Sequence, residues 1–168
     1  MPPIPQPSLT LLKLSTNAIA SCASFTGHAN LRILDLKANK LTSCEGLKDL
    51  TALEALYLGE NEITSLQGLS NLPQLKRLHV RKNQIASLPK EQVPELPSLT
   101  YLNLRENPIA ALSDLENLSH LSEVNYINMI GTATADELAD GFKKEILIKY
   151  PHLVKITFNK EAFTDEEI

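Results

Sequence analysis

The sequence predicts a protein of the α/β class: a horseshoe-shaped solenoid with a parallel concave sheet of about six strands and short 3₁₀ or helical convex segments. A pattern of leucines followed by an asparagine recurs with a period of 22 residues. Within each copy a Leu-x-Leu pair alternates, as in a short strand with one buried face. One copy cannot bury its leucines alone, so stacked neighbours must do it together. The chain has 168 residues and is 43% hydrophobic, which suffices for one continuous core.

Five copies of the pattern are complete. In each copy the residues follow the order Leu-x-x-Leu-x-Leu-x-x-Asn-x-Ile/Leu, with Val80 as the one exception at the third leucine. The copies begin at Leu9, Leu31, Leu53, Leu75 and Leu99. The fourth copy therefore carries a two-residue insertion, which we place in the proline-rich segment 88–97. We expect a degraded sixth copy formed by Leu121, Val124 and Tyr126, with Met129 where the asparagine belongs.

The asparagine at the ninth position of each copy has a structural interpretation. Its side-chain amide both donates and accepts, so it can bond backbone groups that a sharp turn leaves unpaired. We therefore predict a buried amide ladder within and between the coils. Its members are Asn17, Asn39, Asn61, Asn83 and Asn107.

The second half of each copy supplies the remaining core residues. Leucine recurs at the fourteenth position, where Cys22 and Cys44 stand in the first two copies. Convex segments this short favour 3₁₀ or single-turn helices. The two cysteines lie one period apart, close enough for a disulfide on distance alone. Core positions in an intracellular protein instead favour reduced thiols.

The ends of the chain depart from the repeat, which divides it into four parts. Residues 1–8 form a proline-rich lead too short for a capping helix, and residues 9–130 form the repeats. We expect a helix-strand cap over residues 131–158, since Leu138, Phe142 and Ile146 have helical spacing and Pro151 would end the helix. Residues 159–168 form an acidic tail. The first strand then has an open edge. Either this edge pairs with a partner, or the chain is shorter than other proteins of this kind.

Composition and spacing exclude several function classes. No apolar run is long enough for a transmembrane helix, and the N-terminus lacks the basic and apolar segments of a secretory leader. The chain has no phosphate-binding glycine loop and no Gly-x-Ser-x-Gly motif. The histidines, at positions 28, 79, 120 and 152, have no metal-ligand spacing. We therefore expect no enzyme, no metal, no cofactor and no small-molecule substrate.

Positions 3, 5 and 7 of each copy point to the concave face, because side chains alternate along a strand. One end of this face is apolar, with Leu11 beside Ile33, and the centre is aromatic and basic. Tyr and Arg clusters are enriched at interface hot spots, although a mixed solvated surface is the alternative. The predicted partner-binding residues are Tyr57, Arg77, His79, Arg81, Tyr101, Asn103 and Arg105.

The charges are unevenly distributed along the chain. Residues 75–109 carry an excess of three positive charges, whereas residues 110–140 contain six acidic residues and no Lys or Arg. A partner with an acidic helix or loop would suit the basic centre. Nucleic acid is a weaker candidate, because the local positive excess is small.

These copies resemble the family of short, 22-residue leucine-rich repeats with a C-terminal cap. The cap resemblance lies in Phe142-Lys143, Ile146-Leu147 and Pro151-His152-Leu153, followed by acidic residues. Family members with such a cap include the dynein leucine-rich light chain, the spliceosomal A-prime protein and axonemal proteins of the radial-spoke type. The radial-spoke type is the most similar.

The resemblance implies a non-catalytic protein-protein interaction module. It further implies a structural or scaffold component of a ciliary or flagellar axonemal assembly, in the cytoplasm, with axonemal proteins as partners and no membrane attachment. Two alternatives stay open: a protein-phosphatase-regulatory or nuclear scaffold leucine-rich-repeat protein, and a ribonucleoprotein-associated module like the spliceosomal relative. Both would allow the nucleus as the location.

Overall fold

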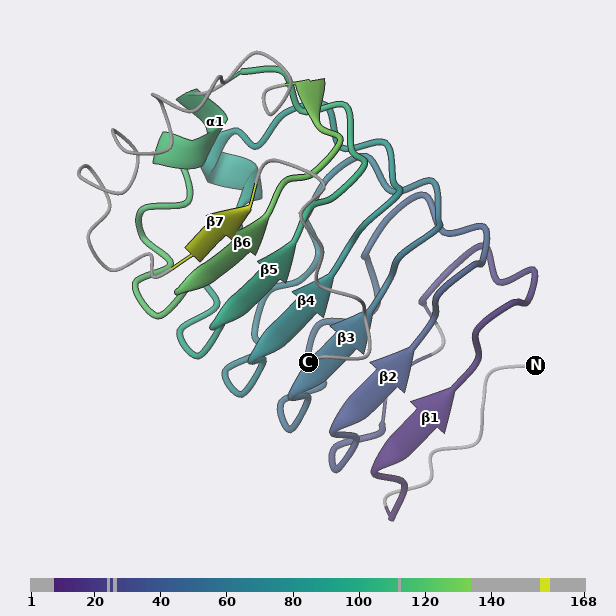
Figure 1. Ribbon diagram of the computed structural model, residues 1–168. Coiled ribbons are helices and arrows are strands. Elements are labelled where there is room, and N and C mark those ends of the chain that lie inside the picture. Colours follow the sequence, from purple (N-terminus) through teal and green to yellow (C-terminus); the bar gives the residue numbers. More distant parts are fainter. Residues whose placement is uncertain (1–7, 24, 26, 112, 134–154, 158–168) are drawn as a thin grey trace.

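The computed structural model describes residues 8–23, 25, 27–111, 113–133 and 155–157. Stacked coils place seven short strands side by side in one parallel sheet, in chain order from β1 to β7 (Figure 1). The strands are β1 (Leu11–Lys13), β2 (Ile33–Asp35), β3 (Ala55–Tyr57), β4 (Arg77–His79), β5 (Tyr101–Asn103), β6 (Tyr126–Asn128) and β7 (Lys155–Thr157). The α/β solenoid and its parallel sheet are thus confirmed.

The strand register follows the repeat. In the first five coils the middle residue of each strand is a leucine of the pattern, and Leu34 pairs with Leu56 as Leu56 pairs with Leu78. These leucines are fully buried from β2 onward, whereas Leu12 of β1 is only partly buried. Of the three residues of each strand, only the two on either side of the buried leucine can turn toward the concave face.

A sharp turn follows each strand. The residue before the asparagine adopts left-handed backbone geometry in every coil, with φ between 52° and 58° in the first five coils. The residues are Thr16, Ala38, Glu60, Lys82 and Glu106. This conformation costs a residue other than glycine roughly 1–2 kcal/mol. The hydrogen bonds of the following asparagine hold the turn in this shape.

The sixth coil lies in a different register from the one we expected. Tyr101 pairs with Tyr126 and Leu102 pairs with Ile127, so Ile127 rather than Val124 is the inward residue of β6. This register buries Ile127 and leaves the phenol of Tyr126 on the concave face. The ninth position of the repeat, which holds asparagine in the other coils, then falls on Thr132 and not on Met129. Met129 is instead a buried residue of the hydrophobic core.

One backbone angle and one side-chain hydrogen bond agree with the corrected register. Gly131 has φ 70°, at the place of the left-handed residue in the other coils. The Thr132 hydroxyl donates to the carbonyl of Met129 at 2.9 Å, as the asparagine of the preceding coil, Asn107, does to Leu104. The longer fifth coil contains the helix α1 (Ser113–Glu116), which accounts for the shifted register.

Within the described residues, the fourth and fifth coils carry helical turns on the convex side. The insertion forms the 3₁₀ helix η1 (Lys90–Gln92), and α1 follows one coil later. Polar contacts to Leu88 join the two coils. Asp114 Oδ1 accepts from the N–H of Leu88 at 3.0 Å, and the Asn117 amide donates to the carbonyl of Leu88 at 2.9 Å. The first three coils turn without a helix in the described residues.

The ends of the solenoid are described only in part. Strand β7 pairs in parallel with β6, with Ile156 opposite Ile127. The expected cap helix, the acidic tail and nearly all of the proline-rich lead lie outside the described residues. No helix in the described part of the chain is both long and apolar enough to span a membrane.

Candidate partner-binding face

The predicted binding residues come together on the concave side of β3, β4 and β5 and in the turns that follow. In the sheet Ala55 is opposite Arg77, and Tyr57 is opposite His79. The next strand continues both rows, with Tyr101 beside Arg77 and Asn103 beside His79. The predicted residues therefore form neighbouring rows across three adjacent coils.

Aromatic rings form a continuous stack across this face. Tyr57 stacks on His79 with ring centroids 4.6 Å apart, and His79 contacts Tyr101 at 4.9 Å. Tyr101 stacks on Tyr126 at 4.8 Å with ring planes only 8° apart. Tyr126 was missed by the sequence analysis because the sixth coil was assigned the wrong register. Its aromatic character, next to Tyr101, was the signal that could have corrected that register.

The predicted residues differ in how far they reach solvent. Arg77 is exposed, and Tyr57, Arg81 and Arg105 are half-buried. His79, Tyr101 and Asn103 are buried, at 8%, 7% and 1% exposed. They form the floor of this face rather than its outer surface.

Asn103 is turned back onto its own coil. Its Oδ1 accepts from the N–H of Arg105 at 3.1 Å, and its amide nitrogen donates to the Tyr101 hydroxyl at 3.4 Å. Asp35 and Asn128 accept in the same way from the N–H two residues later. The fifth position of the repeat thus shapes the turn wherever it holds Asp or Asn, a recurrence that the sequence analysis did not use.

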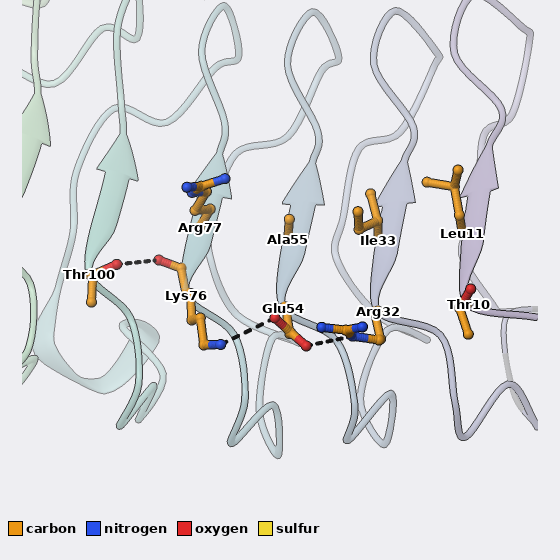
Figure 2. Close-up of a pocket in the computed structure, with 9 residues that line it drawn as sticks. All are labelled: Thr10, Leu11, Arg32, Ile33, Glu54, Ala55, Lys76, Arg77 and Thr100. Atoms are coloured by element: carbon orange, nitrogen blue, oxygen red, sulfur yellow. Dashed lines mark hydrogen bonds and ion pairs between the residues drawn. The ribbon is translucent and has the colours of Figure 1, made fainter. Parts of the chain in front are cut away.

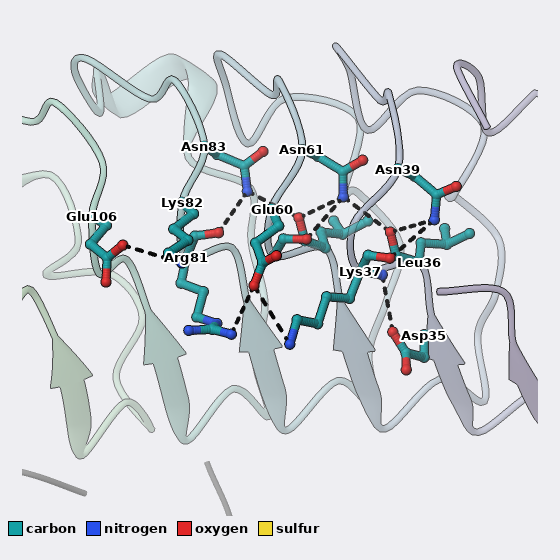
Figure 3. Close-up of polar contacts among 12 residues, drawn as sticks. Asp35, Leu36, Lys37, Asn39, Glu60, Asn61, Arg81, Lys82, Asn83 and Glu106 are labelled. Atoms are coloured by element: carbon teal, nitrogen blue, oxygen red, sulfur yellow. Dashed lines mark hydrogen bonds and ion pairs between the residues drawn. The ribbon is translucent and has the colours of Figure 1, made fainter. Parts of the chain in front are cut away.

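Several cations at the edge of the face are paired with glutamates in the turns, as Figure 3 shows for Glu60. Arg81 Nη2 lies 3.0 Å from Glu60 Oε1, and Lys37 Nζ lies 3.6 Å from the same oxygen. Arg105 Nε lies 2.7 Å from Glu106 Oε1, and Lys82 also contacts Glu106 at 3.8 Å. Each carboxylate is shared by two cations, so each cluster keeps a positive excess.

The asparagines behind the turns are bonded both within and between coils (Figure 3). Asn61 Oδ1 accepts from the N–H of Leu41 at 3.0 Å, and its nitrogen donates to the carbonyls of Leu36 and Leu58 at 3.0 and 2.9 Å. Asn39, Asn83 and Asn107 repeat the arrangement. Asn17 differs, since it is exposed and, among the residues that the structure describes, its amide bonds carbonyls of its own coil.

The histidine and cysteine side chains do not form a ligand cluster in the described residues. No group of three or more His, Cys, Asp or Glu side chains there could hold a metal ion. His28 is 2% exposed and stands three residues before a copy begins, where Leu50 and Leu72 stand in the next coils. It therefore belongs to the core. Cys22 and Cys44 are both free and buried.

The two thiols are expected to be unreactive in the folded chain. Burial raises the pKa of both Cys22 and Cys44 from 9.0 to about 12, so the reactive thiolate is about 10³-fold less populated than in the unfolded chain at pH 8. We predict that iodoacetamide alkylates both far more slowly in buffer than in urea, as followed by mass spectrometry. A reductant should leave the melting temperature unchanged. Equal alkylation rates, or a lower melting temperature, would contradict this assignment.

Comparison with known proteins yields a family match and several relatives. Residues 11–167 match the family model described as leucine-rich repeat. Leucine-rich repeat-containing protein 23 of human is 33% identical over 73 residues, and its mouse counterpart is 34% identical over the same length. The match covers 44% of this chain and 20% of each relative. The chain thus matches only a fifth of the length of these curated relatives.

Two solved structures have a similar fold. A leucine-rich repeat protein of Leptospira interrogans is 28% identical with a TM-score of 0.64, covering 74% of this chain and 32% of that one. Internalin C2 of Listeria monocytogenes is 25% identical with a TM-score of 0.65, covering 86% and 59% of the two chains.

Proposed function

Because this chain belongs to the leucine-rich repeat family, whose stacked coils form protein-interaction modules, we propose that it is a non-catalytic scaffold that binds a partner on its concave face. We further propose that it acts in a ciliary or flagellar axonemal assembly of the radial-spoke type. Tyr57, Arg77, Arg81 and Arg105 form the outer surface of the proposed site. His79, Tyr101 and Asn103 support it from below.

The continuous aromatic stack from Tyr57 to Tyr126 is the observation that carries this proposal. It joins four adjacent strands by ring contacts of 4.6 to 4.9 Å. Side chains held this way lose little further freedom on binding, so the ordering cost of association is small. Large, rigid aromatic side chains next to arginine are also the composition found at interface hot spots.

The charge pattern supports an acidic helix or loop as the partner segment. Glu60 and Glu106 are each shared between two cations, so the rim of the face stays positive overall. A partner carboxylate could pair with the second cation of each cluster. The pairs made by Lys37 and Lys82 are the more exposed ones. Exposed ion pairs contribute only about 0–1 kcal/mol each to folding, so exchanging the partner of either lysine has a low cost.

The axonemal setting is supported by the relatives. The matched segment of leucine-rich repeat-containing protein 23 extends over 44% of this chain, beyond what one repeat covers. The sequence resemblance to axonemal proteins points the same way.

We predict that a tagged copy of the chain localises to the axoneme of a ciliated cell and captures an axonemal protein. Replacing Arg81 and Arg105 by glutamate together should reduce that capture at least tenfold, because it removes both cations and adds repulsion toward an acidic partner. Quantitative mass spectrometry of the captured proteins measures the effect.

Two further variants control this experiment. Arg81→Gln with Arg105→Gln removes the cations without placing a new carboxylate beside Glu60 or Glu106, and it should also weaken capture. Lys48→Glu, at an exposed position away from the concave face, should change nothing. Unchanged capture by the double reversal would refute the binding face. Nuclear localisation, or capture that ribonuclease abolishes, would favour the nuclear or ribonucleoprotein alternative.

A further inference from the structure

A groove of about 460 Å³ lies on the concave face toward its N-terminal end (Figure 2). It spans the first five coils and is formed by two rows of side chains. The third position of the repeat supplies one row, in which Leu11, Ile33, Ala55 and Arg77 follow each other. The residues just before the strands, among them Arg32, Glu54 and Lys76, supply the other.

The row of third-position residues is apolar over its first three coils. Leu11 and Ile33 are opposite each other in the pairing of β1 with β2, and Ala55 is next in β3. Leu11 is 45% and Ile33 37% exposed, and these two are the exposed large hydrophobic residues of the described part of the chain. Adjacent exposed aliphatic side chains in a concave site are a typical anchor for a partner.

The row of residues before the strands, together with Arg77, carries the charges of the groove. Glu54 is shared by Arg32, with Nε at 2.6 Å, and by Lys76, with Nζ at 3.2 Å (Figure 2). The hydrogen bond from Arg32, followed by the one from Lys76, lowers the pKa of the Glu54 carboxyl, which stays ionised at neutral pH. Arg77 is exposed, and within the described residues its guanidinium has no ion pair. The groove therefore has three cations and one carboxylate.

On the basis of the proposed function, we propose that this groove binds an amphipathic α-helix of the partner protein, with an aliphatic anchor on Leu11 and Ile33 and a carboxylate on Arg77. Neighbouring strands lie about 4.8 Å apart, so the two strand steps from Ile33 to Arg77 span roughly 10 Å. Seven helical residues rise by about the same distance. The aliphatic and acidic residues therefore lie seven positions apart on one face of the helix.

The experiment selects 16-residue peptides from a displayed random library against the full chain and measures their affinity by fluorescence anisotropy. We expect the selected peptides to share an aliphatic residue and an acidic residue seven positions later. Ile33→Asp and Arg77→Glu should each weaken binding at least tenfold, whereas Lys48→Glu should not. Replacing the peptide's acidic residue by lysine should restore binding to Arg77→Glu, an effect that a merely structural role of Arg77 would not produce.

The remaining outcomes also decide the question. If Ile33→Asp lowers the melting temperature, Leu11→Asp provides the same test of the apolar contact on another strand. Selected peptides that bind all groove variants like the wild type would overturn the proposal, as would a selection that yields no binder. If the wild-type chain is a dimer and Ile33→Asp is a monomer, a second copy of the chain occupies the groove, which would contradict a partner helix as its occupant.

The failure of this proposal and that of the proposed function give different results. If the reversals of Arg81 and Arg105 weaken peptide binding and Ile33→Asp does not, the proposed groove site is wrong. The proposed partner-binding face around Arg81 and Arg105 would remain supported. If the peptides bind the groove as expected but the chain does not localise to the axoneme, the proposed axonemal setting is wrong. The proposed helix-binding groove would remain supported.

Discussion

Replacing Asn61 by alanine is expected to lower the free energy of unfolding by about 3 kcal/mol or more. The substitution removes the bond to the N–H of Leu41 and those to the carbonyls of Leu36 and Leu58. These bonds are buried, and a buried backbone group left unsatisfied costs roughly 1–3 kcal/mol. The change also loosens the turn in which Glu60 has φ 58°. Urea unfolding followed by circular dichroism measures the loss.

Asn17 provides the matched control. It stands at the same position of the first coil but is exposed, and its bonds to Leu14 and Ser15 stay within one coil. Water can replace it there, so Asn17→Ala should cost less than about 1 kcal/mol. Equal losses for the two variants would show that the bonds between coils do not stabilise the stack.

Replacing Gly46 by alanine is expected to destabilise the chain by about 3 kcal/mol. Gly46 has φ 97°, and a Cβ built there would lie 2.5 Å from the carbonyl oxygen of Cys22 and 2.7 Å from Cα of Ala23. Both atoms are backbone of the preceding coil, so the coils themselves would have to separate. Overpacking costs about 1–3 kcal/mol and a strained backbone a similar amount. The midpoint of thermal unfolding reports the change.

Gly59 is the control for this effect. A Cβ at Gly59 would meet Cγ of Arg81 at 3.1 Å, which is side chain and can move. Gly59→Ala should therefore cost less than about 1 kcal/mol, since its backbone does not have positive φ. Comparable destabilisation by Gly46→Ala and Gly59→Ala would mean that the close approach of the coils at Gly46 does not limit their packing.

The sixth coil shows where a sequence pattern stops being sufficient. In coils one to five, each strand is preceded by a leucine and followed by a leucine, or by Val80 in the fourth coil, at fixed distances, so the register has one solution. After Asn107 the spacing changes and no asparagine marks the turn. Two registers then bury apolar residues, one through Val124 and one through Ile127. The pairing of β5 with β6 selects the second, since it buries Ile127 and Met129 and keeps Tyr126 in the aromatic stack.

The coil, the parallel sheet and the rows of residues on its concave face could be predicted from the amino-acid sequence. This is possible because strand alternation and the stacking of identical coils depend only on spacing along the chain. Which of those residues reach solvent, and which cations are paired, depends on how the coils pack in three dimensions. Tyr101 is buried and Arg77 is exposed although both occupy the third position, because exposure depends on side chains from neighbouring coils, more than 20 residues away in the sequence.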